Sequence, residues 1–267
     1  TASKRRRDLI LTQREPETDT TKVLAGDYGA FNDLVLRAKQ AREMFLVIGP
    51  PGTGKTSFGM LNIVREELAS GDSCILLTAY TNYAVDEICS KLREAGIDFI
   101  RIGSELMCSP AYRDNLIENR TAQCKDLGAI KELIKNTRVF CGTTSSLNGS
   151  AALFSIKSFD IAVVDEASQI LEPHLVGLMS AQCNGTEAIK KFVFIGDHKQ
   201  LPAVVQQTAD ESAVTDSELL GINLTDCRLS LFERLLRKYK DDPRYVYMLT
   251  RQGRMHRDIA MFPNISF

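Results

Sequence analysis

Short apolar runs alternate with amphipathic segments along most of the chain. Apolar residues recur at helical spacing from Tyr28 to Ala41, and the run Met44–Ile48 predicts a short buried strand. The pattern then repeats, with strands expected at 74–78, 138–141, 161–164, 192–195 and 245–249, and helices at 58–71, 84–95 and 228–239. Strands that alternate with helices in this way indicate an α/β fold built on a mostly parallel sheet.

Three segments depart from this alternation. Residues 104–137 are polar and mostly helical, which predicts a helical insert between core strands. The stretch between Lys199 and Arg228 contains acids and hydroxyl residues but no basic residue, which predicts a mobile surface loop. Residues 1–25 include a basic run and a polar stretch. We interpret them as a solvated connector from an upstream region, which leaves residues 26–267 as the folded domain.

Composition narrows the class of protein. Hydrophobic residues make up 44% of the 267 residues and charged residues 25%, as in globular domains. The seven cysteines form no CxxC pair, which disfavours a zinc or iron–sulfur site and is typical of reduced thiols inside a cell. The absence of a signal-peptide core and of a membrane span favours an intracellular location, in the bacterial cytosol or a eukaryotic nucleus, without a membrane partner. The net charge of −1 disfavours nucleic-acid binding by bulk attraction, so any such contact must be local.

A phosphate-binding loop (Walker A pattern) follows the strand Met44–Ile48 directly. The pattern GxxxxGK[ST] is complete, and its residues are Gly49, Pro50, Pro51, Gly52, Thr53, Gly54, Lys55 and Thr56, followed by Ser57. Glycines let successive backbone N–H groups wrap phosphates, and the following helix directs its positive end at them. In this pattern the lysine reaches the β- and γ-phosphates and the Thr56 hydroxyl ligates Mg²⁺. The alternative is an ordinary tight turn, which the strand and helix on either side disfavour.

Two acids, Asp165 and Glu166, follow the apolar run 161–164. A carboxylate at the end of a buried strand is costly unless it meets a cation. We therefore expect Asp165 to share Mg²⁺ with Thr56, and Glu166 to polarise the water that attacks the γ-phosphate. The alternative for these acids is a surface turn.

Further motifs give the chain a family resemblance. In order they are GPPGTGKT (49–56), TAYTNYAVDEI (78–88), CGTTSSL (141–147), VVDEASQ (163–169), GDHKQLPAVV (196–205), SLFERL (230–235) and QGRMHRDIAMFP (252–263). The chain resembles superfamily 1 helicases, of the branch that contains nonsense-mediated-decay RNA helicases and replication nuclease-helicases. This resemblance implies a three-layer P-loop domain, the first of two RecA-like domains, with the second absent from this chain.

The resemblance also implies roles for residues in the later motifs. Gln200 would contact the γ-phosphate, with Asp197 and His198 orienting its loop, and Arg254 would act like an arginine finger. Asn32 stands where the family has an adenine-reading glutamine, and Gly253 where it has a tyrosine that stacks on adenine. Both departures predict weak discrimination among ATP and other triphosphates, unless Tyr28 or Phe31 supplies a stacking platform.

The motifs at 78–88 and 141–147 are where the family touches a single strand. The candidate contact residues are Thr81, Asn82, Tyr83, Thr143, Thr144 and Ser145. Short donors can hold phosphates without reading bases, and a tyrosine can stack on a base. The alternative for the Ser and Thr residues is that they cap the helices that follow.

Together these features predict an ATP-binding and ATP-hydrolysing motor domain of a superfamily 1 DNA helicase. The resemblance suggests movement from 5′ to 3′ on single strands, and DNA over RNA as the partner. The alternatives are an RNA helicase and a nucleotide-gated nucleic-acid clamp with slow turnover, which Asn32 and Gly253 favour. An unrelated P-loop kinase or switch is disfavoured because GDHKQLP and DEASQ have no place in one. We expect this chain alone to be folded, monomeric, and weakly active or inactive without the second RecA-like domain.

Overall fold

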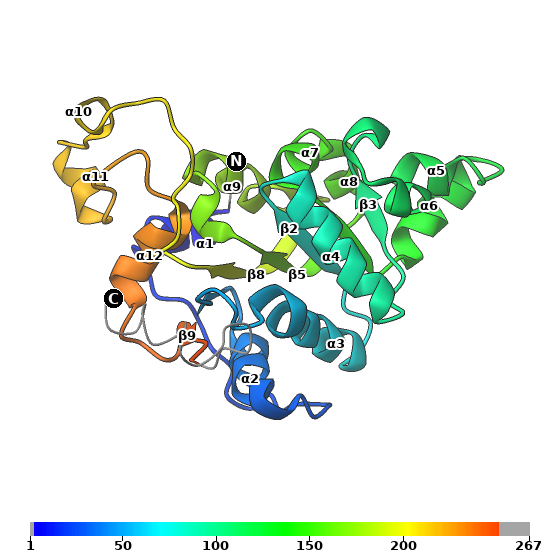
Figure 1. Cartoon of the computed structure of the whole chain (residues 1–267), viewed down its shortest axis with the longest axis horizontal. Helices are drawn as coiled ribbons and strands as arrows, with labels where there is room; N and C mark the ends of the chain where they lie inside the picture. Colours follow the sequence, from blue (N-terminus) through cyan, green and yellow to red (C-terminus); the bar gives the residue numbers. More distant parts are fainter. Residues whose placement is uncertain (1–2, 251–267) are drawn as a thin grey trace.

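The fold is built on one central sheet, which the computed structural model shows within residues 3–250, the part of the chain that it describes (Figure 1). Its strands are β1 (Met44–Ile48), β2 (Ile75–Ala79), β3 (Ile100–Ile102), β4 (Val139–Thr143), β5 (Phe159–Val164), β8 (Ile189–Gly196) and β9 (Val246–Met248). They lie in the order β3-β4-β2-β5-β8-β1-β9, and every neighbouring pair is parallel. This confirms the predicted α/β fold. The edge strand β3 was not predicted, because a strand this short gives no periodicity to read.

Alternation along each strand divides the core into two halves. In β1, Phe45 and Val47 face one side of the sheet, while Met44, Leu46 and Ile48 face the other. The first side is covered by the helices α2 (Asn32–Gln40), α3 (Leu61–Ala69) and α4 (Asn82–Glu94). The second is covered by α1 (Lys4–Ile10), α6 (Leu127–Asn136), α7 (Thr144–Asn148), α8 (Ala151–Ile156), α9 (Glu172–Met179) and α12 (Leu231–Tyr239). The result is the predicted three-layer arrangement, in which a strand buried on both faces, such as β1, can be apolar throughout.

Parallel pairing brings the carboxyl ends of distant segments to one edge of the sheet. Ile48 pairs with Gly196 across β1 and β8, and Val164 pairs with Phe194 across β5 and β8. The segments that follow these strands therefore emerge side by side. In open parallel sheets this edge is where ligands bind.

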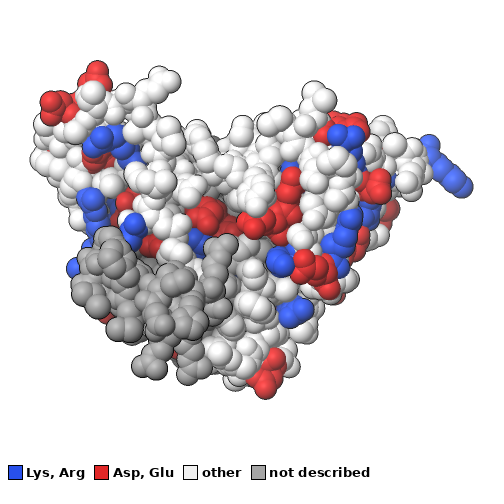
Figure 2. Space-filling view, viewed as in Figure 1, with Lys and Arg blue, Asp and Glu red and all other residues white. Residues whose placement is uncertain are grey.

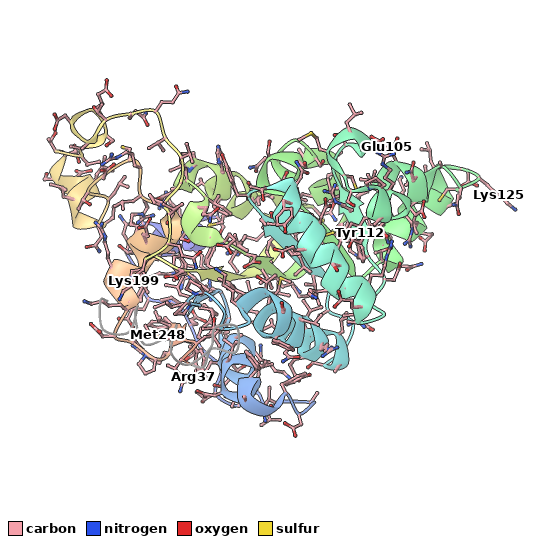
Figure 3. All side chains as sticks on the ribbon, in the orientation of Figure 1. Arg37, Glu105, Tyr112, Lys125, Lys199 and Met248 are labelled. Carbon is pink, nitrogen blue, oxygen red and sulfur yellow. The ribbon has the colours of Figure 1, made fainter. Side chains whose placement is uncertain are left out.

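The helical insert follows β3 and projects from the edge of the sheet. It consists of α6 and of three short helices, η3 (Glu105–Met107), η4 (Pro110–Asn115) and α5 (Ile117–Thr121). Lys125 extends from its outer tip, on the opposite side of the molecule from Lys199 (Figure 3). The segment between Lys199 and Arg228 contains two short helices, α10 (Ala209–Ser212) and α11 (Ser217–Gly221), and Thr208 and Glu211 form a capping box at the first.

Smaller elements complete the structure. These are η1 (Gly29–Phe31), the π-helical turn η2 (Lys55–Met60), η5 (Ala167–Gln169) and an antiparallel hairpin of β6 (Gln182–Cys183) and β7 (Thr186–Glu187). Within residues 3–250, none of the helices has the length and apolar character needed to cross a bilayer.

The N-terminal segment corrects one expectation. Residues 4–10 form α1, with Leu9 and Ile10 buried in the core, so they are not a solvated connector. Arg6 is only 2% exposed, because its guanidinium donates to the Ile189 carbonyl at 2.7 Å and to Glu187 Oε2 at 2.6 Å. A basic run normally indicates a solvated face. Here the carbonyls and the carboxylate that hold Arg6 come from residues far along the chain.

A second buried arginine, Arg234 in α12, predicts a large loss of stability on substitution. Its side chain is 0% exposed, and it donates to Glu172 Oε2 at 2.8 Å, to the Ile10 carbonyl at 3.0 Å and to the Ile222 carbonyl at 3.2 Å. Arg234→Ala leaves a carboxylate and two carbonyls without their donor. We expect the free energy of unfolding in urea to fall by about 3 kcal/mol.

The matched control lies on the same helix. Arg237 is exposed and, among the residues that the structure describes, donates only to Thr225 Oγ1, at 2.6 Å. Arg237→Ala should therefore change the free energy of unfolding by less than about 1 kcal/mol. Equal losses in the two variants would show that the Arg234 network does not stabilise the fold.

Candidate nucleotide-binding site

The phosphate loop has a conformation that depends on its glycines. Gly52 and Gly54 have φ angles of +77° and +75°, in the left-handed region that favours glycine. A Cβ added to Gly54 would lie 2.8 Å from Phe58 Cδ2, so the site has no room for one. The Thr53 hydroxyl donates to the Pro50 carbonyl at 2.7 Å and closes the loop. The geometry is that of a backbone cradle for phosphate groups.

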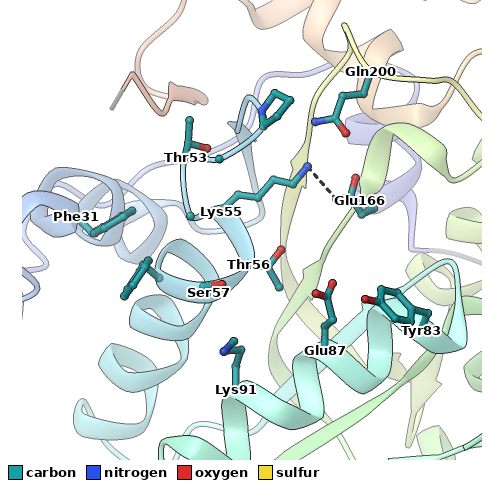
Figure 4. Close-up of a pocket in the computed structure, with 14 residues that line it drawn as sticks. Phe31, Thr53, Lys55, Thr56, Ser57, Tyr83, Glu87, Lys91, Glu166 and Gln200 are labelled. Carbon is teal, nitrogen blue, oxygen red and sulfur yellow. Dashed lines mark ion pairs between the residues drawn. The ribbon is translucent and has the colours of Figure 1, made fainter. Parts of the chain in front are cut away.

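Two polar pairs lie beside this loop at the ends of β1 and β5. Lys55 Nζ forms an ion pair with Glu166 Oε1 at 2.9 Å (Figure 4). The Thr56 hydroxyl donates to Asp165 Oδ2 at 2.7 Å. Asp165 is buried, and this burial raises its pKa to about 6. The four side chains predicted from two separate motifs are thus in direct contact.

Glu166 has an unusual backbone conformation. Its φ of +51° is left-handed, although it is not a glycine, and its backbone N–H donates to Asp165 Oδ1 at 3.0 Å. Within residues 3–250, its Oε2 atom is buried with no hydrogen-bond partner. Strained residues of this kind cluster at functional sites. The carboxylate therefore has one oxygen paired with Lys55 and one free to accept a proton or a hydrogen bond.

The donor set fits Mg²⁺. Thr56 Oγ1 and Asp165 Oδ2 are hard oxygen ligands at hydrogen-bond distance from each other, beside the phosphate cradle. Mg²⁺ in nucleotide sites is usually held by one or two protein ligands together with substrate phosphates. The residues suit a metal ion that arrives with its nucleotide.

Gln200 lies at the same pocket, after β8. Its Nε2 donates to Asp197 Oδ2 at 3.0 Å, and Asp197 Oδ1 accepts from the Lys199 backbone N–H at 3.0 Å. Asp197 is buried and its own N–H donates to Ser168 Oγ at 3.3 Å. The structure therefore orients Gln200 through Asp197. His198 is exposed and has no such contact in residues 3–250.

Asn32, which was expected at the nucleobase, is instead held by hydrogen bonds outside the pocket. Asn32 Oδ1 accepts from the Tyr28 N–H at 2.7 Å, and Asn32 Nδ2 donates to Asp27 Oδ1 at 2.8 Å. Both ends of the amide are thus engaged in the turn before α2, and Asn32 does not line the pocket. Gly253 and Arg254 lie outside the described residues, so their predicted roles stay predictions.

The six candidate residues for contact with single-stranded nucleic acid separate into exposed and buried residues. Tyr83 is 76% exposed, and Thr81, Asn82 and Ser145 are also accessible. Thr144 is 1% exposed, and the buried Thr143 caps α7 by accepting from the Ser146 N–H at 3.0 Å. We expected the side chains of Thr143 and Thr144 to face a single strand of nucleic acid. This expectation is corrected, because both side chains are buried at the end of β4. Thr81 also acts as a cap, accepting from the Ala84 N–H at 3.1 Å.

The pocket contains Phe58, Glu87 and Lys91, for which the sequence predicted no role in the site. It has a volume of about 840 Å³. Besides the phosphate loop, Glu166 and Gln200, its lining includes Phe31, Phe58, Tyr83, Glu87 and Lys91. Glu87 and Lys91 lie on α4, whose i, i+4 spacing puts them on one exposed face. Phe58 was assigned to the apolar face of the helix after the loop, but it is 59% exposed.

Comparison with known proteins agrees with the motifs. The chain is 31% identical to a human protein named DNA replication ATP-dependent helicase/nuclease DNA2, over 98% of this chain and 24% of that protein. It is 34% identical to the Arabidopsis thaliana protein named DNA replication ATP-dependent helicase/nuclease JHS1, over 86% and 15%. The chain thus spans about a quarter of the length of such relatives, or less.

A solved structure described as a complex of Arterivirus nonstructural protein 10 (helicase) with DNA aligns with a TM-score of 0.47. Its identity is 15%, and the alignment covers 87% of this chain and 42% of that one. A family model described as an AAA domain matches residues 32–124 and 116–208, which is more than half of the chain. The chain therefore belongs to the AAA-domain family that this model defines.

Proposed function

We propose that this domain is the ATP-hydrolysing motor of a superfamily 1 DNA helicase. The observation that supports this most directly is that Lys55, Thr56, Glu166 and Gln200 line one pocket beside a phosphate cradle. Asp165 accepts from the Thr56 hydroxyl at this pocket. Phosphoryl transfer needs this combination of positioning groups, metal ligands and a group that orients water. The relatives at about 30% identity, which are named ATP-dependent helicases, support the same reaction.

Each side chain then has a defined task. The loop N–H groups and Lys55 hold the triphosphate, and Glu166 leaves Lys55 to accept a proton from the attacking water. Thr56 and Asp165 would hold Mg²⁺, which neutralises charge on the phosphates when it is bound. Gln200, oriented by Asp197, would contact the terminal phosphate. The products are a nucleoside diphosphate and phosphate.

Single-stranded nucleic acid would bind at the accessible candidate residues near the pocket. Thr81, Asn82 and Ser145 offer short polar contacts to phosphates, and Tyr83 offers a ring for stacking. Tyr83 lies on α4 together with Glu87, and both line the nucleotide pocket, so this helix connects the two sites. Figure 2 shows acidic and basic side chains interspersed across this face, without a single basic band among the described residues. Contacts of this local kind suit a near-neutral domain.

The relatives named as DNA replication helicases favour DNA over RNA, movement along single strands, and, for a eukaryotic protein, a nuclear location. A second RecA-like domain of the same protein would complete the surface that binds the nucleic-acid strand. It would also contribute side chains to the nucleotide pocket. The direction of movement, 5′ to 3′, is proposed from the family resemblance.

The test is the ATP hydrolysis rate of the full-length protein with no nucleic acid, with single-stranded DNA and with single-stranded RNA. We expect DNA to raise the rate at least about tenfold. Stimulation by RNA alone would favour the RNA helicase. Slow hydrolysis that no strand stimulates, with nucleotide-dependent strand binding, would favour the clamp and contradict the proposal.

A further inference from the structure

An aromatic pair lies beside the phosphate loop, at the end of the pocket away from Glu166. The rings of Phe31 and Phe58 are stacked, with centroids 6.0 Å apart and an angle of 25° between their planes. Both residues line the same pocket as Lys55 and Glu166. In Figure 4, Phe31 lies across Lys55 from Glu166, so the pocket runs from the carboxylate to the aromatic pair.

Local structure fixes this pair against the phosphate loop. The N–H groups of Phe58 and Gly59 both donate to the Gly54 carbonyl, at 2.8 and 2.9 Å, and this π-helical turn holds the Phe58 ring against Gly54. At Gly59 a Cβ would lie 3.4 Å from Leu34 Cδ2, so the missing side chain lets α2 pack closely on this turn. Phe31 lies one helical turn before Leu34 and is thereby brought over Phe58.

Core packing does not account for Phe58, which remains 59% exposed while touching Phe31. Exposed apolar surface rimmed by polar groups is typical of ligand-binding grooves. When phosphates occupy the loop, the sugar and base of the nucleotide extend beside it, where these rings lie. Flat aromatic rings bind nucleobases by stacking.

We propose that Phe31 and Phe58 form the platform for the nucleobase of the bound triphosphate. This inference rests on the proposed function, because it concerns the same pocket. Stacking recognises the flat face of a base and not its edge. The amide of Asn32, which would be the edge reader, is engaged by Tyr28 and Asp27. The platform therefore selects a purine by its ring area and accepts ATP and GTP alike. In this proposal a platform that includes Phe31 does not bring the stronger preference for ATP that the sequence analysis linked to it, because stacking does not read the base edge.

The experiment compares nucleotides with inorganic tripolyphosphate, which has the phosphates but no base. Affinities of the full-length protein for the Mg²⁺ complexes of ATP, GTP and tripolyphosphate are measured by competition against a fluorescent nucleotide. In the unaltered protein we expect ATP and GTP to bind within about threefold of each other, and both about tenfold more tightly than tripolyphosphate.

Phe58→Ala should weaken ATP and GTP binding about tenfold and leave tripolyphosphate binding unchanged. Phe58→Trp should keep the affinity for both nucleotides, because it restores a ring. Leu106→Ala, which removes another exposed apolar side chain outside the pocket, is the matched control and should change nothing.

Three results would overturn the platform. They are unchanged nucleotide affinity in Phe58→Ala, an equal loss for ATP and tripolyphosphate, or a hundredfold preference of the unaltered protein for ATP over GTP. These results differ from a failure of the proposed function, in which the unaltered protein would bind none of the three compounds or would bind them without hydrolysing ATP.

Discussion

Lys55→Ala should reduce ATP hydrolysis at least about a thousandfold, which corresponds to ~4 kcal/mol of transition-state stabilisation. The ammonium group of Lys55 is 2.9 Å from Glu166 Oε1, beside the buried Asp165. Without the Lys55 ammonium, the carboxylates of Asp165 and Glu166 lie near the phosphates with one cation fewer. Binding of the Mg²⁺–ATP complex should therefore weaken as well. Phosphate release and nucleotide binding are measured on the full-length protein with a saturating single strand.

The control for Lys55→Ala is Lys125→Ala, at the exposed tip of the insert. It removes the same charge from the chain and should leave both measurements unchanged. Far-ultraviolet circular dichroism checks that each variant is folded. Turnover at the normal rate in a folded Lys55→Ala protein would contradict the assignment of the whole site.

Glu166→Gln should separate nucleotide binding from hydrolysis. The amide has the shape of the carboxylate and can occupy the same left-handed backbone conformation, but it cannot accept a proton from water. We expect hydrolysis to fall about a thousandfold, within the range for loss of a general base, while ATP affinity stays within about threefold. Single-turnover hydrolysis and equilibrium binding of ATP are the two measurements.

Glu132→Gln is the matched control for this variant. Glu132 is exposed on α6 and does not line the pocket. Its substitution should leave hydrolysis within about twofold of normal. If Glu166→Gln instead loses binding and hydrolysis together, Glu166 holds the loop in place and is not the base.

The sequence by itself determined the parts of the site that depend on local geometry. The loop 49–56 follows a strand of five apolar residues, and its glycines and lysine keep their relative positions whatever the rest of the chain does. The same holds for Asp165 and Glu166 after β5. Because parallel strands end at one edge, two local patterns were enough to predict that Thr56 and Asp165 meet.

Tertiary structure alone decided the roles of residues whose partners are distant in the chain. Thr81 and Thr143 both stand at the ends of strands and both cap helices, yet Thr81 is exposed and Thr143 is buried. The pairing register makes this difference, because Thr143 is still within β4 and pairs with Ala79 of β2, whereas Thr81 lies beyond the end of β2. Capping a helix and contacting a nucleic-acid strand use the same residue types, so the sequence cannot tell which of the two a given Thr does.

Phe58 shows the same limit at the nucleobase end of the pocket. It has helical spacing typical of a core residue, and only the packing of α2 on the turn after the phosphate loop leaves Phe58 open to the pocket. Arg6 shows the reverse, since its partners at 187 and 189 bury a residue that a basic run would place in water. Periodicity and spacing are properties of neighbouring residues, whereas burial is set by whichever element packs alongside. The sequence therefore determined the phosphate end of this site, and tertiary packing decided what surrounds it.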